Sequence, residues 1–145
     1  MLIRLVGTMQ SRGVLSGKMS GKCREMNAII SIKPQYVEEI LAGRKRFEFR
    51  KAVFARPVGK VYIYASAPVS KVVGEFKPAE ILQGEPAEIW KKTEAYSGIT
   101  KTYFDTYFEG RKIAYAIKIQ NLQIYKEPKE LPFQAPQSYR YIDML

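Results

Sequence analysis

The sequence predicts an α+β domain in which a small, mixed but mostly antiparallel β-barrel carries short helices inserted between its strands. Strand-like segments outnumber helical ones, and the helical segments lie between strands. The 145 residues, 46% of them hydrophobic, suffice for one domain with its own core. No internal repeat and no second domain is visible. We therefore expect a single domain over residues 26–145.

Residues 1–25 lack the patterning of the rest of the chain. They contain four glycines and five basic residues against one acidic residue, with no sustained hydrophobic period. Such a segment is typical of a flexible N-terminal extension, or is an artefact of the assigned start site with Met26 as the true first residue.

The first elements of the domain are expected directly after this segment. Residues 28–32 form an apolar run that predicts a buried strand. Pro34 then suits the first turn of a helix whose apolar residues recur at helical spacing, and Gly43 suits its end. In the stretch AGRKRFEFRK (42–51), Phe47 and Phe49 alternate with charged residues, which predicts a half-buried strand.

Further strands and two short helices follow. Residues 61–65 are β-branched or aromatic except for the final alanine, and predict a central strand; residues 72–76 predict another, with a bulge or a close backbone approach at Gly74. Residues 86–109 predict two helices, the second capped by Thr100. Residues 113–119 alternate as a long strand. The aromatic, proline-rich tail is too apolar for a linker and is expected to pack across the domain. Four aromatic residues of the second helix predict a core-facing stripe or, alternatively, a stacking surface for bases: Tyr103, Phe104, Tyr107 and Phe108.

The composition restricts the chemistry. The chain has no histidine, which excludes histidine-based triads and the usual zinc sites, and no metal-ligand cluster is present in the sequence. We expect neither a metal nor another cofactor. Cys23 is the only cysteine, so no internal disulfide can form and a cytoplasmic location is favoured. No apolar run approaches the roughly 20 residues of a membrane span, so no membrane partner is expected.

The charge favours a polyanionic partner. The net charge is +10, and outside residues 1–25 there remain 19 basic and 13 acidic residues, a net +6. A polyanion is the partner that this surplus indicates, with simple solubility charge as the alternative explanation. The sequence identifies no protein partner.

Three segments together resemble the ASCH family, whose members are small domains with a PUA-like β-barrel. The first is Ile32-Lys-Pro with the helix end and strand of residues 40–50, which matches Gly-x-Lys followed by Glu-x-Arg. The second comprises residues 61–66 and 73–76. The third is residues 115–119, leading to Ala135-Pro-Gln-Ser-Tyr. The resemblance extends from Met26 to Tyr141.

The resemblance implies a PUA-like fold and a link to RNA in regulatory or translation-related roles. Some relatives are enzymes: amidohydrolases acting on N4-acetylcytidine, whose Gly-x-Lys lysine is catalytic and corresponds to Lys45, and at least one ribonuclease. The amidohydrolases carry threonine where this chain has Glu48, which disfavours that activity here. Glu94 lies where an acidic partner would fall if the comparison with them held.

Lys45, Glu48 and Arg50 are the central candidates for a site. A lysine with a lowered pKa can act as base or nucleophile, and a Glu–Arg pair is either a structural ion pair or a reader of bases and phosphates. Strict strand alternation places Lys45 opposite Glu48, unless a twist after Gly43 brings them together. Glu75 is a weaker candidate for the cleft. The expected catalytic residues, if the protein is an enzyme, are Lys45, Glu48 and Glu94, and the expected RNA or ligand contacts are Lys33, Arg44, Lys45, Glu48, Arg50, Gln137, Ser138 and Tyr139.

The leading hypothesis is therefore a small cytoplasmic protein that binds RNA, or a nucleotide derived from it, in a basic cleft. The alternative is an enzyme of the same fold, an N4-acetylcytidine amidohydrolase or a ribonuclease, that uses Lys45. A protein-interaction domain with incidental basic charge is a third.

Overall fold

A computed structural model describes residues 2–4 and 26–145 of the chain. Apart from residues 2–4, the expectation for residues 1–25 falls outside the described residues. None of the helices described is long and apolar enough to span a membrane. The elements in chain order are β1 (Leu2–Arg4), β2 (Met26–Ile32), α2 (Pro34–Leu41), β3 (Phe47–Arg50), β4 (Val58–Ala65), β5 (Lys71–Gly84), α3 (Pro86–Thr93), the 3-10 helix η2 (Glu94–Tyr96), α4 (Lys101–Tyr107), β6 (Ala114–Lys129) and β7 (Tyr139–Ile142).

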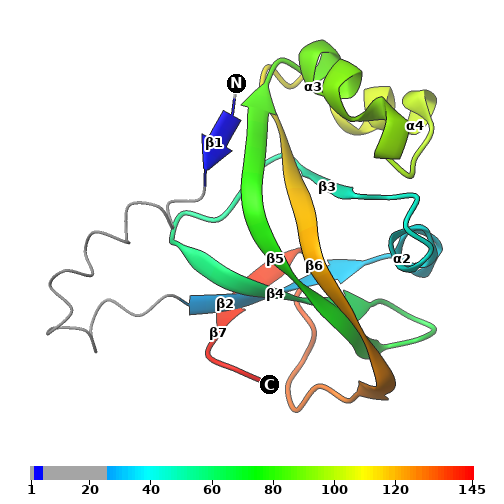
Figure 1. Ribbon diagram of the computed structural model, residues 1–145, viewed down its shortest axis with the longest axis vertical. Coiled ribbons are helices and arrows are strands. Elements are labelled where there is room, and N and C mark those ends of the chain that lie inside the picture. The colour runs from blue at the N-terminus through cyan, green and yellow to red at the C-terminus, as the bar shows by residue number, and fades with distance from the viewer. Residues whose placement is uncertain (1, 5–25) are drawn as a thin grey trace, which may run out of the picture.

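The strands form one curled sheet in the order β3-β6-β5-β4-β2-β7, and β1 pairs with β5. β2 and β4 are parallel and the remaining pairs are antiparallel. The long strands β5 and β6 run side by side through most of the molecule, α3 and α4 cover one of its ends, and α2 lies at the side (Figure 1). The predicted α+β class with a mixed, mostly antiparallel sheet is confirmed, and the sheet forms a half-barrel.

The main core fills the inside of this half-barrel. β2 and β4 contribute fully buried residues such as Ile30 and Ile63, and α2 adds Val37 and Ile40 from its inner face. These positions follow from the apolar runs and the helical spacing of the sequence, because both patterns place apolar side chains on a buried face.

A second core lies beneath α3 and α4, and it divides the aromatic stripe predicted for the second helix. Phe104 and Phe108 are buried there together with Ile89 of α3. Tyr103 is exposed and Tyr107 is half-buried. The prediction of a core-facing stripe is therefore confirmed for the two phenylalanines and in part for Tyr107, which packs against this core. It is wrong for the exposed Tyr103, because α4 turns only one of its faces to the core.

Several local predictions are confirmed. Pro34 occupies the first turn of α2, and the Thr100 hydroxyl accepts a hydrogen bond from the Tyr103 amide at 3.0 Å, which caps α4. Gly43 follows α2 with a φ of +83°, in the left-handed region that favours glycine. The tail also packs across the domain, since β7 pairs with β2.

Gly74 marks the predicted close approach between backbones. A β-carbon at this position in β5 would lie 2.6 Å from the carbonyl oxygen of Gln123 in β6. The register between β5 and β6 shifts on both sides of this pair. A side chain here would therefore push apart the two strands on which the half-barrel is built.

We expect Gly74→Ala to lower the free energy of unfolding by about 1–3 kcal/mol, because the added methyl group meets a backbone oxygen that cannot rotate away. Urea denaturation of the variant and the wild type measures the difference. A variant as stable as the wild type would show that β6 moves without cost at Gln123.

Candidate functional site

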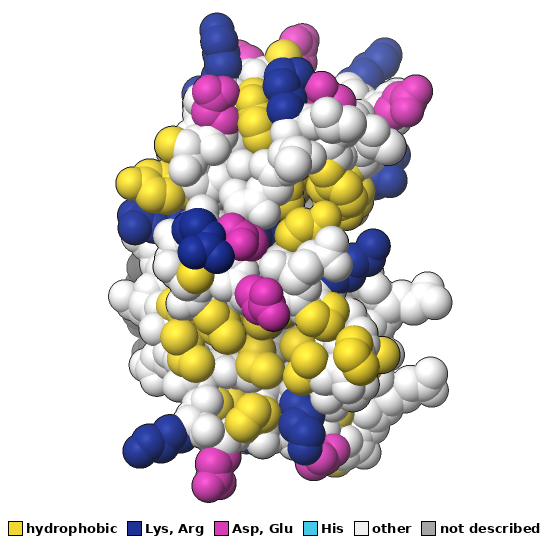
Figure 2. Space-filling view, turned by 90° about the vertical axis from the view of Figure 1, so that its right-hand side faces the viewer, with side chains coloured by type: hydrophobic (Ala, Val, Ile, Leu, Met, Phe, Trp, Pro, Cys, Tyr) yellow, Lys and Arg dark blue, Asp and Glu magenta, His cyan; other side chains and the backbone are white. Residues whose placement is uncertain are grey.

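A cavity of about 500 Å³ opens between α2, α4, the loop after β4 and the segment before β7. Its wall combines charged, aromatic and hydroxyl side chains with only a few aliphatic ones. Figure 2 faces the side of the molecule that carries α2 and α4, and it shows hydrophobic side chains next to dark blue basic ones. The polar and aromatic side chains that line the cavity are Ser31, Lys33, Tyr36, Lys45, Glu48, Phe49, Arg50, Tyr64, Ser66, Ser70, Tyr103, Tyr107 and Gln137.

Lys45 is almost completely buried at this cavity, with 3% of its surface exposed. Its Nζ donates a hydrogen bond to the carbonyl oxygen of Ser97 at 3.0 Å and lies 4.8 Å from the ring centre of Phe49. Glu48 Oε1 is 3.7 Å away. Burial lowers the pKa of Lys45 below its ordinary value, and the carboxylate of Glu48 opposes that shift.

Two glycines allow Lys45 to reach this position. Gly43 turns the chain in the left-handed region, and β3 begins only at Phe47, so strand alternation does not govern residue 45. Lys45 and Glu48 therefore both line the cavity, with Nζ and Oε1 3.7 Å apart. Gly98, with a φ of +69°, lies over the lysine: a β-carbon there would be 2.3 Å from Cβ of Lys45.

Glu48 and Arg50 form a two-pronged ion pair at the same wall. Arg50 Nη2 and Nε lie 2.7 and 3.1 Å from Glu48 Oε2. The guanidinium also donates to the carbonyl oxygen of Ser31 at 3.0 Å and to the hydroxyl of Ser138 at 3.2 Å. The pair is thus a structural ion pair that also lines the cavity. When Lys45 is protonated, the net charge of Lys45, Glu48 and Arg50 together is +1.

Three tyrosines make up an aromatic wall. The rings of Tyr36 and Tyr103 are 5.3 Å apart, and Tyr103 and Tyr107 stack at 6.2 Å with an angle of 13° between their planes. Burial raises the pKa of both Tyr103 and Tyr107, so both keep their protons at neutral pH. In the sequence, Tyr36 lies at helical spacing with the apolar residues of its helix. Its hydroxyl on an otherwise aliphatic face was the signal for a cavity position, whereas no pattern indicated Tyr64, Ser66 or Ser70.

The remaining residues predicted for the site lie in different places. Lys33 and Gln137 line the cavity and are exposed, and Ser138 reaches it through its bond to Arg50. Tyr139 is not part of the lining, because it belongs to β7 and packs edge-on against Phe54 at 5.0 Å.

Two further predicted residues lie at a separate hollow. Arg44 is exposed and paired with Glu39 at 2.9 Å, outside the cavity wall. Glu94 belongs to η2 and is exposed. It lines the same separate hollow as Arg44, so the structure does not bring it together with Glu48 at the cavity.

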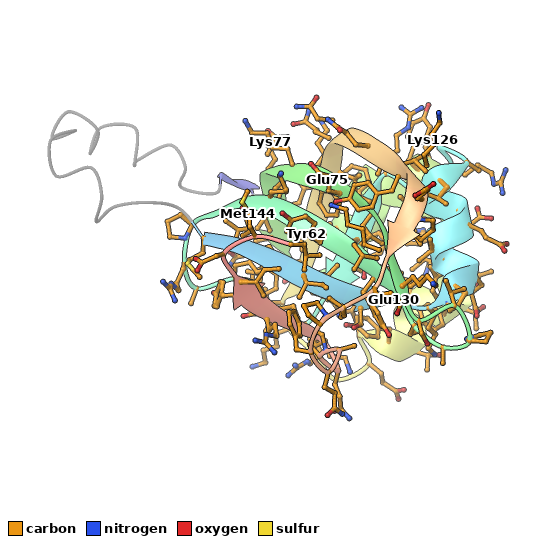
Figure 3. The ribbon with its side chains drawn as sticks, turned by 90° about the horizontal axis from the view of Figure 1, so that it is seen from below. Tyr62, Glu75, Lys77, Lys126, Glu130 and Met144 are labelled. Carbon is orange, nitrogen blue, oxygen red and sulfur yellow. The ribbon has the colours of Figure 1, made fainter. Side chains whose placement is uncertain are left out.

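Glu75, the weaker cleft candidate, also lies elsewhere. It accepts a hydrogen bond from the Tyr125 hydroxyl at 2.6 Å and pairs with Lys60 at 3.3 Å, and it is not part of the cavity lining. Figure 3 shows Glu75 next to Tyr62 of the neighbouring strand. These partners lower the pKa of Glu75 and keep it ionised.

The described residues contain no group of three or more side chains suited to hold a metal ion. The chemistry available at the cavity therefore consists of one buried amine, the exposed amine of Lys33, one carboxylate, one guanidinium, the amide of Gln137 and a set of hydroxyl groups. Such a set can bind an anion with an attached aromatic ring, and a neutral lysine within it can take up a proton.

Comparison with known proteins agrees with this architecture. An ASCH domain-containing ribonuclease from Zymomonas mobilis is 28% identical over 123 residues, which cover 79% of this chain and 83% of the relative. The crystal structure of ASCH from Zymomonas mobilis matches with a TM-score of 0.73 at 28% identity, over 80% of this chain and 87% of that one. Large ribosomal subunit protein uL22 of Ureaplasma parvum is 29% identical over 119 residues, and the match spans only 38% of its length.

The family model described as the ASCH domain matches residues 30–123. This range contains the Gly-x-Lys and Glu-x-Arg segment as well as the helices that close the cavity. On this match the chain belongs to the ASCH domain family, as its sequence resemblance implied.

Proposed function

We propose that this protein binds RNA, or a nucleotide derived from RNA, in the cavity lined by Lys45, Glu48 and Arg50. The observation that carries the proposal is the convergence of these three side chains, neighbours in one motif, on a single concave site. Membership of the ASCH family and the similarity to a protein named as a ribonuclease support it.

The electrostatics of the cavity fit a nucleotide. Protonated Lys45 and Arg50 exceed the single carboxylate of Glu48 by one positive charge, and Lys33 adds an exposed cation at the wall. A phosphate group would neutralise that surplus through charge-assisted hydrogen bonds. The tyrosine wall offers ring faces on which an unpaired base can stack. We propose further that the protein acts in the cytoplasm in a regulatory or translation-related role. We also propose that residues 26–145 form a single domain.

A second candidate function is RNA cleavage, favoured by the burial of Lys45 and the direction of its pKa. A neutral amine can take the proton from a ribose 2′-hydroxyl, whose oxygen then attacks the adjacent phosphorus while the bond to the 5′-oxygen breaks. The proton taken up by the lysine can pass to that leaving oxygen. Deacetylation of N4-acetylcytidine is the less favoured enzymatic alternative, because the chain has Glu48 instead of threonine and Glu94 lies outside the cavity.

Gly98→Ala and Gly110→Ala form a matched pair that tests binding at the cavity. Both glycines have a positive φ, so both substitutions cause similar backbone strain, but only a β-carbon at Gly98 collides with Lys45. We expect Gly98→Ala to weaken binding of a fluorescent single-stranded RNA by about tenfold, and Gly110→Ala to leave it unchanged. Fluorescence anisotropy at several salt concentrations measures both. Equal affinities of the two variants, or affinity of the wild type that does not fall with salt, would contradict binding in this cavity.

Lys45 variants test the catalytic candidate. If the protein cleaves RNA or deacetylates N4-acetylcytidine, Lys45→Ala abolishes turnover, and Lys45→Arg does so too because a guanidinium does not lose its proton. The rate of the wild type rises with pH until the lysine is neutral. Chromatography of the products on both substrates provides the measurement. A wild type that converts neither substrate eliminates the enzymatic candidate and leaves the binding proposal intact.

The lowered pKa of Lys45 also has a consequence for stability. Above that pKa the folded lysine is neutral while the unfolded chain still binds a proton, up to about pH 10.5. In this window the unfolded state binds one proton more than the folded state, so folding releases a proton and becomes more favourable as the pH rises. We expect the free energy of unfolding of the wild type to rise with pH relative to Lys45→Met. Urea denaturation at a series of pH values checks this, and parallel pH profiles would contradict a lowered pKa.

A further inference from the structure

The aromatic wall of the cavity continues as a ladder toward its edge. Tyr36 of α2 lies near the buried amine, 5.9 Å from Lys45 Nζ to the ring centre. The ring centre of Tyr103 lies 5.3 Å from that of Tyr36, and the ring centre of Tyr107, one helical turn further along α4, lies 6.2 Å from that of Tyr103. We call these three residues the tyrosine ladder. All three line the cavity, and the exposed Tyr103 is open to a ligand larger than the cavity itself.

Unpaired cations lie beyond the last step of this ladder. Lys51 Nζ is 4.7 Å from the ring centre of Tyr107. Arg111 lies just after α4, four residues beyond Tyr107, and its amide donates to the carbonyl oxygen of Phe108 at 2.9 Å. Among the described residues, neither side chain forms an ion pair with a carboxylate. Both are exposed.

We propose that the cavity holds one nucleotide of a longer single-stranded RNA, and that the following nucleotides lie along the tyrosine ladder with their phosphates at Lys51 and Arg111. The inference rests on the proposed function and deepens it, because it identifies the ligand as a polymer instead of a free nucleotide. Aromatic ring faces combined with nearby cations are the usual means of holding single strands, since every base can stack and every nucleotide carries a phosphate. Paired bases in a duplex do not offer their faces in this way.

The test compares ligands of different length. For each of the four bases, the affinities of the 5′-monophosphate and of a ten-nucleotide single strand are measured by competition with a labelled RNA. We expect the strand of the preferred base to bind at least about tenfold more tightly than its monophosphate. The double variant Lys51→Ala/Arg111→Ala binds the strand about tenfold more weakly and keeps its affinity for the monophosphate. The slope of its log affinity against log salt concentration becomes shallower by about 0.7 for each phosphate that the variant no longer neutralises.

A matched control uses two exposed lysines of α3 that lie in neither the cavity lining nor the ladder. Lys91→Ala/Lys92→Ala removes the same number of positive charges, and we expect it to leave both affinities unchanged. Tyr107→Leu removes the ring and should weaken binding of the strand, and Tyr107→Phe, which keeps the ring, should weaken it less.

The possible failures are distinguishable. A strand that binds no better than its monophosphate, or an equal loss of affinity for both double variants, would overturn the ladder while the cavity proposal stands. No binding of either ligand would overturn the proposed function and the ladder with it.

Discussion

The buried amine of Lys45 is the constraint on which the rest of the site depends. An ammonium group loses its hydration when it is buried, so the surrounding structure must supply partners or the group gives up its proton. This chain supplies the Ser97 carbonyl, the ring face of Phe49 and, at a longer distance, Glu48. Ser97 belongs to the helical segment between β5 and β6, which contains α3, η2 and α4, and the other two partners belong to β3. The Lys45 side chain therefore fixes this segment against β3.

Arg50 connects β3 to elements on the other side of the cavity. Its guanidinium joins Glu48 in β3 to the carbonyl of Ser31 in β2 and to Ser138 just before β7. β3 and β7 are the two ends of the sheet order, and the arginine connects them without a strand pair. A single Glu-x-Arg spacing therefore both closes the half-barrel near the cavity and places a cation at its wall.

Much of the fold was predictable from local pattern. Alternation at Phe47 and Phe49 marks a half-buried strand, Thr100 caps a helix through a hydrogen bond three residues along the chain, and a glycine inside a strand marks a close backbone approach. The site was only partly predictable. Whether Lys45 and Glu48 meet depends on where β3 begins, and that boundary is decided by the left-handed turn at Gly43. Packing between distant elements decides the rest: Tyr139 was expected at the cavity, and its pairing in β7 turns it to Phe54 instead. The sequence around Tyr139 contains no signal for this choice, because it depends on packing against Phe54, a residue far away in the chain.

Anion binding and base catalysis at this site would require opposite protonation states of Lys45. A phosphate close to Lys45 stabilises the ammonium form and raises its pKa, which favours retention of an anionic ligand. Proton abstraction requires the neutral amine, which burial and the charge of Arg50 favour and Glu48 opposes. Since Arg50 holds Oε2 of Glu48 and leaves Oε1 3.7 Å from the amine, the carboxylate is shared between two cations. For the two proposed functions, the position of a phosphate relative to Lys45 therefore decides whether binding or base catalysis is favoured.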